Sequence, residues 1–144
     1  MQSDVILNKV ASIERCVARV REEYQKDILT FATDYTRQDA ALLNIQRACE
    51  LCIDIGQHII RKENLGLSQS ARDVFAILAQ HHKIPTVLAQ NLQNMVGFRN
   101  IVVHSYQQIN MVIVIAVIEQ RLDDFLQFTQ ALLPQYCLLE DKIC

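Results

Sequence analysis

The chain of 144 residues has few turn-forming residues: it contains three glycines and two prolines, and it has no tryptophan. An all-β sandwich or barrel needs a turn roughly every 8–12 residues, so this scarcity argues against that class of fold. Hydrophobic residues make up 51% of the chain, and the leucine, isoleucine, alanine, glutamine, arginine and glutamate that dominate it favour helices. The composition therefore predicts an all-α protein.

Neither sign of charge is in large excess. Fourteen lysines and arginines against sixteen aspartates and glutamates give a formal net charge of −2, so a nucleic-acid site would have to be a local patch. The longest apolar run, MVIVIAVI at 111–118, has eight residues, whereas a membrane helix needs about 20. We therefore expect a soluble protein that does not bind a membrane.

The five cysteines are odd in number, and no secretory leader precedes them: Cys16, Cys49, Cys52, Cys137 and Cys144. Free thiols in a reducing cytoplasm are the simplest interpretation. Cys49 and Cys52 form a C-x-x-C pair inside a predicted helix. Zinc would need two further ligands there, from His58, His81 or His82, and thiols at this spacing are more often part of a core.

Apolar residues recur at steps of three and four near the start of the chain, which is the spacing of one helix face: Ile6, Val10, Ile13, Val17, Val20 and Tyr24. Later helix starts are indicated by capping residues and a first-turn proline: Thr36 with Asp39, Ser70 with Asp73, Pro85, and Asn110. We expect the last helix to run to about Leu133 and to stop before Pro134.

These segments predict one domain over residues 1–144. Its fold class is all-α, an antiparallel bundle of about five helices. The core covers about residues 4–133, and residues 134–144 form a short tail without a clear assignment.

Residues 99–106, RNIVVHSY, concentrate the reactive side chains of the chain in one short stretch. The guanidinium of Arg99 offers a rigid fork of donors that matches phosphate oxygens. The imidazole of His104 can take up and return a proton near neutral pH. Together they suit attack of an internal 2′-hydroxyl on a phosphodiester, with the histidine moving the proton and the arginine stabilising the phosphoryl charge. Such a reaction needs no metal or other cofactor and selects RNA.

The spacing of this pair leaves three interpretations open. In an unbroken helix Arg99 and His104 would point about 140° apart, because each residue turns the helix by ~100°. Either the helix ends between them, or each residue works with its counterpart on a second chain. The third interpretation is structural: near a helix C-terminus an arginine complements the dipole and a histidine can bond a free carbonyl.

Two other polar groups have mainly structural interpretations. His81 and His82 suit a helix C-terminus, where a cation complements the dipole. Arg15, Arg19 and Lys26 lie roughly along one side of the first predicted helix. Such a run is usually a solvated face, although it could also help to hold RNA or a partner.

The RNIVVHSY stretch is an Arg-x-x-x-x-His-x-Tyr motif, and it resembles the signature of HEPN-domain ribonucleases, specifically the HepT-like toxin family. Three segments occur in the order expected of that family: TRQDAALLNIQRACELCIDIG (36–56), LGLSQSARDVFAILA (65–79) and MVGFRNIVVHSY (95–106). The resemblance covers roughly residues 4–133.

The resemblance implies a homodimeric, cytoplasmic, metal-independent endoribonuclease toxin of a type II-like or type VII-like toxin–antitoxin pair. Arg99 and His104 would be the catalytic pair, with copies from both subunits facing one cleft, and Asn100 would support them. Tyr106 matches the tyrosine to which a nucleotidyltransferase-type (MNT) antitoxin of the family attaches AMP. That modification would block the cleft with negative charge. The substrate would be RNA, and no cofactor or metal is expected.

A second hypothesis keeps the fold and removes the catalysis. The same bundle could be a non-catalytic HEPN-fold module that pairs with a nucleotidyltransferase protein without cutting RNA.

Overall fold

The computed structural model describes residues 2–140, and side chains are described for residues 4–135. Six α-helices follow one another: α1 (Gln2–Gln25), α2 (Tyr35–Glu63), α3 (Ala71–Gln80), α4 (Thr86–His104), α5 (Met111–Gln120) and α6 (Leu122–Glu140). Two short 3-10 helices join them, η1 (Phe31–Thr33) before α2 and η2 (Tyr106–Gln108) before α5. Residues 2–140 contain no strand, so the predicted all-α class is confirmed.

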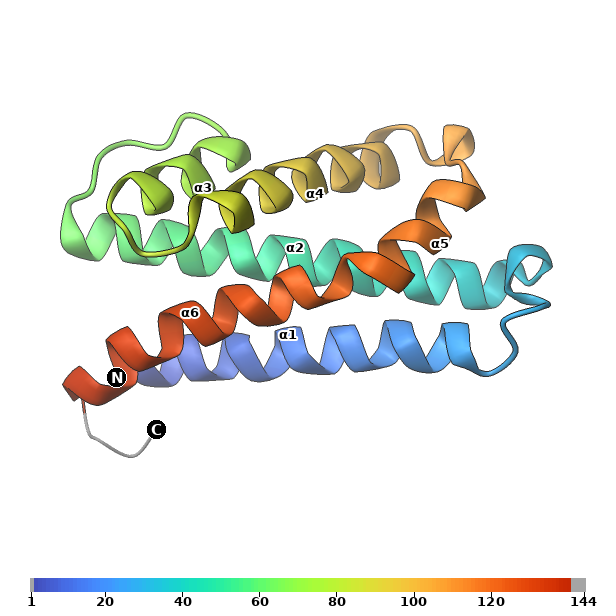
Figure 1. Ribbon diagram of the computed structural model, residues 1–144, viewed down its shortest axis with the longest axis horizontal. Helices are drawn as coiled ribbons and strands as arrows, with labels where there is room; N and C mark the ends of the chain where they lie inside the picture. The colour runs from blue at the N-terminus through green and yellow to red at the C-terminus, as the bar shows by residue number, and fades with distance from the viewer. Residues whose placement is uncertain (1, 141–144) are drawn as a thin grey trace.

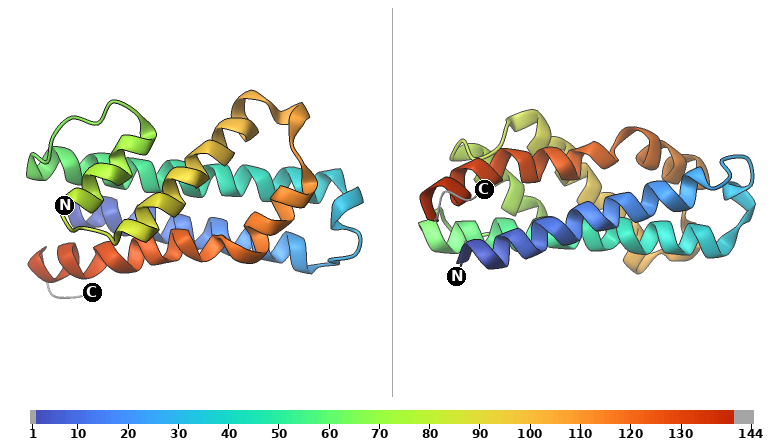
Figure 2. Two further views of the ribbon diagram at one scale, coloured as in Figure 1. Left: turned by 45° about the horizontal axis from the view of Figure 1, so that its top comes forward. Right: turned by 90° about the horizontal axis from the view of Figure 1, so that it is seen from below.

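The two longest helices, α1 and α2, run antiparallel along the length of the molecule (Figure 1). α6 lies along α1, α4 packs on α2, and the short α3 packs against both α2 and α4. Figure 2 shows that α4 runs obliquely to the long pair. The turn from α4 through η2 to α5 lies at the same end of the bundle as the connection between α1 and α2 (Figure 1).

The predicted apolar stripe of α1 is the buried face of that helix. All six of its residues are at most 6% exposed: Ile6, Val10, Ile13, Val17, Val20 and Tyr24. They belong to the same core as the buried residues of α2, α3, α4 and α6. The helical period of the sequence therefore placed this face correctly, because burial of one stripe is what stabilises a helix in a bundle.

Of the four predicted helix starts, two caps are confirmed and one is wrong. Pro85 does open α4, as the N-cap residue directly before Thr86. The Ser70 side chain accepts a hydrogen bond from the Asp73 N–H at the start of α3, and Asn110 accepts one from Val112 at the start of α5. At the start of α2 the capping residue is Asp34, which accepts from the Arg37 N–H at 3.2 Å, and not Thr36. The carboxylate two residues earlier already satisfies the free N–H group, so the helix begins sooner.

The predicted last helix differs from the structure in two ways. It divides at Arg121 into α5 and α6, which raises the number of α-helices to six. Because the helix divides, the axes of α5 and α6 point in different directions (Figure 2). Val114 of α5 and Phe125 of α6 are both fully buried in this arrangement. In addition, α6 does not stop at Pro134, which lies inside the helix. The Gln135 amide donates to the Ala131 carbonyl and to the Lys83 carbonyl, and it thereby anchors the turn after the proline.

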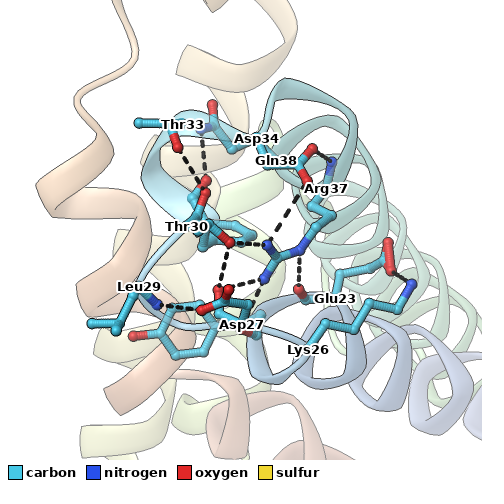
Figure 3. A network of polar contacts seen from close by, with 11 residues as sticks. Glu23, Lys26, Asp27, Leu29, Thr30, Thr33, Asp34, Arg37 and Gln38 are labelled. Atoms are coloured by element: carbon cyan, nitrogen blue, oxygen red, sulfur yellow. Dashed lines mark hydrogen bonds and ion pairs between the residues drawn. The ribbon is translucent and has the colours of Figure 1, made fainter.

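The connection between α1 and α2 is organised by the buried side chain of Arg37 (Figure 3). Its Nε donates to the Glu23 carbonyl at 2.8 Å, and its Nη2 donates to the Tyr24 and Asp27 carbonyls at 3.2 and 2.7 Å. Glu23 and Tyr24 lie in the last turn of α1, where carbonyls lack a partner within the helix, and Asp27 lies in the connection that follows. One guanidinium fork therefore closes the end of α1 from the first turn of α2, and it lies over the Phe31 ring.

Within the described part of the chain, none of the helices combines the length and the apolar character that a membrane-spanning segment requires.

Gly56 sets how closely α2 approaches α3, so the Gly56→Ala variant should be less stable. A Cβ atom at this position would overlap Val74 Cγ1 and lie 3.2 Å from Leu78 Cδ1. We expect the free energy of unfolding to fall by about 1–3 kcal/mol, the usual cost of overpacking. Urea unfolding followed by circular dichroism measures it.

Gly97→Ala is the matched control, because a Cβ there would meet only the mobile end of Arg72, at 2.7 Å from Nη2. It should be neutral or more stable by up to ~1 kcal/mol, since alanine favours the helix. Equal stability of the two variants would contradict the close α2–α3 contact.

Candidate functional site

Arg99 and His104 lie on one unbroken helix. α4 continues to His104, and the N–H of the capping residue Ser105 still donates to the Ile101 carbonyl at 2.9 Å. The hypothesis that the helix ends between the two residues is therefore wrong. At ~100° per residue they point about 140° apart within one chain.

The Arg99 side chain is directed toward α2. It is 19% exposed, and its Nη1 lies 3.9 Å from Oε2 of Glu50. The Gln46 amide donates to the same Glu50 oxygen at 3.4 Å, and the guanidinium also interacts with the Cys49 thiol. The Nε atom is buried without a hydrogen-bond partner among the described side chains. Arg99 is thus held against α2 by its long ion pair with Glu50, and its guanidinium is not fully hydrogen-bonded.

His104 is the last residue of α4, and its side chain is exposed. It lines a hollow of about 400 Å³ together with five neighbours along the chain: Val103, Ser105, Tyr106, Gln107 and Gln108. Arg99 is not among the residues that line it. The histidine can therefore reach a large ligand that approaches this end of the bundle.

Tyr106 begins η2 and is 45% exposed. Its hydroxyl donates a hydrogen bond to Oδ1 of Asp39 on α2. Partial burial, the hydrogen bond to Asp39 and the charge of that carboxylate raise the pKa of Tyr106 to about 12. Two further hollows, of about 440 and 240 Å³, are lined by both Asp39 and Tyr106. The tyrosine oxygen is accordingly accessible and protonated, and it is held against a carboxylate.

The structure thus divides the predicted site residues into two groups. His104 and Tyr106 share one hollow at the end of α4. Arg99 faces α2 one and a half turns earlier, and Asn100, which follows it on α4, is half-buried. Within one chain the arginine therefore faces α2, whereas the histidine lines the hollow at the end of α4.

The alternative zinc site at the C-x-x-C pair is not supported. Cys49 and Cys52 are buried in the core, and burial raises the pKa of the Cys49 thiol to about 12 and that of Cys52 well above its ordinary value. Among the described side chains, no three residues of the metal-ligating types lie close enough to hold a metal ion. Cys16, Cys49 and Cys52 are free thiols, as expected, whereas the side chains of Cys137 and Cys144 lie outside the described residues.

The other basic residues considered as candidates occupy positions with ordinary structural roles. His81 caps the C-terminus of α3, and Arg15 is exposed on α1. Arg19 pairs with Glu22 at 3.0 Å, and Lys26 pairs with Glu23 at 2.5 Å. Arg15 and Arg19 lie on α1, and Lys26 directly follows its last residue. Since the ion pairs join near neighbours in the chain, the run matches the solvated face that was its simpler interpretation.

Two acidic residues of α2 belong to the site and were not found from the sequence. Glu50 contacts Arg99, and Asp39 contacts Tyr106. Both contacts join residues about 50 or more positions apart, and no local motif signals such a contact. The sequence assigned Asp39 to a helix cap, a role that belongs to Asp34.

Comparison with solved structures identifies the class of fold. A solved structure of the tri-AMPylated Shewanella oneidensis HEPN toxin in complex with MNT antitoxin is similar to this chain with a TM-score of 0.85. The identity is 48%, over 89% of this chain and 96% of that one. A crystal structure of a toxin–antitoxin with AMP-PNP matches with the same score, identity and coverage. The fold is therefore of the HEPN type that the sequence predicted.

The family follows from two further findings. A family model described as Ribonuclease HepT-like matches residues 13–132. The mRNA nuclease HepT of Shewanella oneidensis is 49% identical over 126 residues, which are 88% of this chain and 94% of that protein. The chain belongs to the HepT-like ribonuclease family, and the predictions of this family and of a ribonuclease are confirmed.

The thiols of Cys49 and Cys52 should not react in the folded protein. Iodoacetamide attacks the thiolate, and the raised pKa of both groups leaves almost none at neutral pH. We expect no alkylation of either residue during an hour at pH 7.5, measured by peptide mass spectrometry, and complete alkylation in 6 M guanidinium chloride. Rapid modification of Cys49 without denaturant would contradict the buried, protonated state.

Proposed function

We propose that this ribonuclease is the toxin of a toxin–antitoxin pair, that it cleaves RNA in the cytoplasm as a homodimer, and that Arg99 and His104 are its catalytic residues. The observation that carries the proposal is the family match over residues 13–132. That range contains the whole Arg-x-x-x-x-His-x-Tyr motif at an accessible end of the bundle. The 49% identical relative is an mRNA nuclease, which makes messenger RNA the first substrate to test.

In the proposed reaction the 2′-hydroxyl of the RNA attacks the adjacent phosphorus, and the bond to the 5′-oxygen of the next nucleotide breaks. His104 takes the proton from the 2′-hydroxyl, and a second histidine or water returns a proton to the leaving oxygen. Arg99 stabilises the charge that grows on the phosphoryl oxygens. Asn100, directly after the arginine, supports the site. RNA supplies its own nucleophile, so the scheme uses no metal.

The geometry of α4 supports a site built from two copies. One continuous helix points Arg99 and His104 about 140° apart, which supports a site where the arginine of one subunit meets the histidine of the other. Ile101 and Val103, both in the last turn of α4, are apolar and more than 40% exposed. Such residues can be covered by the second subunit.

A mixture of two inactive variants tests the shared site. Arg99→Ala and His104→Ala should each lose RNA cleavage as homodimers. A mixed dimer, formed by co-expression and isolated with two affinity tags, keeps one intact pair. An equal unsorted mixture should regain about a quarter of the parental activity, because half of its dimers are mixed and each has one of two sites.

Parental cleavage should be unchanged by EDTA, and this measurement tests the metal-free chemistry separately. A mixed dimer as inactive as its parents would refute the shared site. Full activity of either homodimer would refute the catalytic assignment of that residue.

We also propose that a nucleotidyltransferase-type antitoxin neutralises the enzyme by attaching AMP to Tyr106. The related toxin in complex with MNT antitoxin is tri-AMPylated, which supports this kind of modification. The exposed hydroxyl of Tyr106 lies beside His104 in one hollow, which supports this position for it. AMP there would bring bulk and negative charge to the substrate site.

Incubation of the purified chain with its nucleotidyltransferase partner and ATP should add AMP to the peptide that contains Tyr106 and should stop RNA cleavage. Tyr106→Phe should remain unmodified and active in the presence of the partner. Tyr35→Phe is the matched control, since Tyr35 is an exposed tyrosine that lines a hollow with Tyr106. AMP on Tyr35 instead, shown by tandem mass spectrometry, would contradict the assignment.

A further inference from the structure

The contact between Asp39 and Tyr106 joins two elements that are 67 residues apart in the chain. Asp39 lies in the second turn of α2, and Tyr106 begins η2. The next residues of α2 toward its start, Arg37 and Gln38, are buried and donate hydrogen bonds to carbonyls of the α1–α2 connection. Because its neighbours are fixed in this way, the Asp39 carboxylate has a defined position at the accessible edge of the site.

We propose that Asp39 accepts the proton of the Tyr106 hydroxyl when that oxygen is joined to AMP, and that it aims the oxygen at the nucleotide. The inference rests on the proposed function, which makes Tyr106 the acceptor of AMP. It adds that the toxin, and not only the modifying enzyme, supplies a group for the transfer reaction.

The chemistry requires such a group. The Tyr106 oxygen forms a bond to the α-phosphorus of a nucleoside triphosphate, the bond between the α-phosphorus and the bridging oxygen breaks, and diphosphate leaves with the electron pair. The phenolic proton must go to a base. With the pKa of Tyr106 raised to about 12, ionisation before the attack is rare at neutral pH, so the proton has to leave during the attack.

Asp39 is the base in position to take that proton. Its Oδ1 already accepts the hydrogen bond from the reacting oxygen. The titratable groups that line hollows with Tyr106 are Asp39 and Tyr35 from α2 and His104 from α4. A tyrosine is a poor proton acceptor at neutral pH, and His104 lines the hollow that Asp39 does not line.

The two hollows that Asp39 and Tyr106 share also give a nucleotide room to approach. Their volumes are about 440 and 240 Å³, and the larger one is lined by apolar Leu42, Ile109 and Met111 as well as by Tyr35. Asp39 itself is exposed, so the nucleotide can reach the tyrosine oxygen while that oxygen remains against the carboxylate.

The test compares the unsubstituted chain with Asp39→Asn, which keeps an acceptor oxygen for the hydroxyl and removes the base. AMP transfer to Tyr106 is measured in single turnovers with the partner nucleotidyltransferase in excess and ATP as the donor, between pH 6 and 9. The rate of the unsubstituted chain should be nearly flat. The rate of Asp39→Asn should be at least about tenfold lower at pH 7 and should rise with pH, as the phenol must ionise by itself.

The transfer rate of Asp39→Asn should still fall at pH 7, even though removal of the carboxylate charge makes Tyr106 easier to ionise. Without that charge the pKa of Tyr106 falls toward its ordinary value of ~10, which still leaves only about 0.1% phenolate at pH 7. Asp54→Asn is the matched control, because Asp54 is an exposed aspartate of the same helix that pairs with Lys9. It should transfer at the unsubstituted rate, and thermal unfolding verifies that both variants are folded.

Each outcome decides the proposal. A slow, pH-dependent Asp39→Asn variant supports it. An unchanged rate overturns it, and so does a slow rate with a flat pH profile, which would show that Asp39 only orients the tyrosine. In either of these results AMP on Tyr106 of the unsubstituted chain leaves the proposed function standing. If the unsubstituted chain itself gains no AMP on Tyr106, the proposed modification and this inference are both wrong.

Discussion

The continuity of α4 to His104 is the constraint on which the candidate site depends. Since the helix does not break, Arg99 is aimed at α2, where Glu50 and Cys49 receive it, and His104 projects from the last turn into solvent. The two side chains leave the helix about 140° apart. This separation favours the proposed arrangement, in which each group works with its counterpart on a second chain. In the proposed enzyme, association and catalysis would therefore be coupled.

The second constraint is the fixed start of α2. Arg37 is 8% exposed and donates to three carbonyls at the end of α1 and the connection that follows. The same few residues thus close the α1–α2 connection and carry Asp39, which reaches across to Tyr106. Burial of a guanidinium is costly unless its donors are hydrogen-bonded. The network that stabilises the fold in this way also positions the proposed modification site, so loss of the Arg37 side chain should disturb the surroundings of Tyr106.

Most of the fold could be predicted because it follows from local periodicity. The stripe from Ile6 to Tyr24 and the caps at Ser70 and Asn110 depend only on near neighbours, and these were correct. The division at Arg121 and the passage of α6 through Pro134 were not predictable, since both result from packing against distant elements. At the site, the motif identified Arg99, His104 and Tyr106. Their partners Glu50 and Asp39 depend on tertiary contacts with α2 that no spacing encodes.

In the proposed scheme, attachment of AMP turns the contact between Asp39 and Tyr106 from attractive to repulsive. The modified oxygen has no proton to donate, and its phosphodiester carries a negative charge. Two such charges about 4 Å apart repel by roughly 1 kcal/mol in water and by about 4 kcal/mol near a protein surface. The modified side chain is therefore driven away from α2. The hollow that Tyr106 shares with His104 is not lined by Asp39. In the scheme, a nucleotide repelled by the carboxylate therefore has room beside the proposed catalytic histidine.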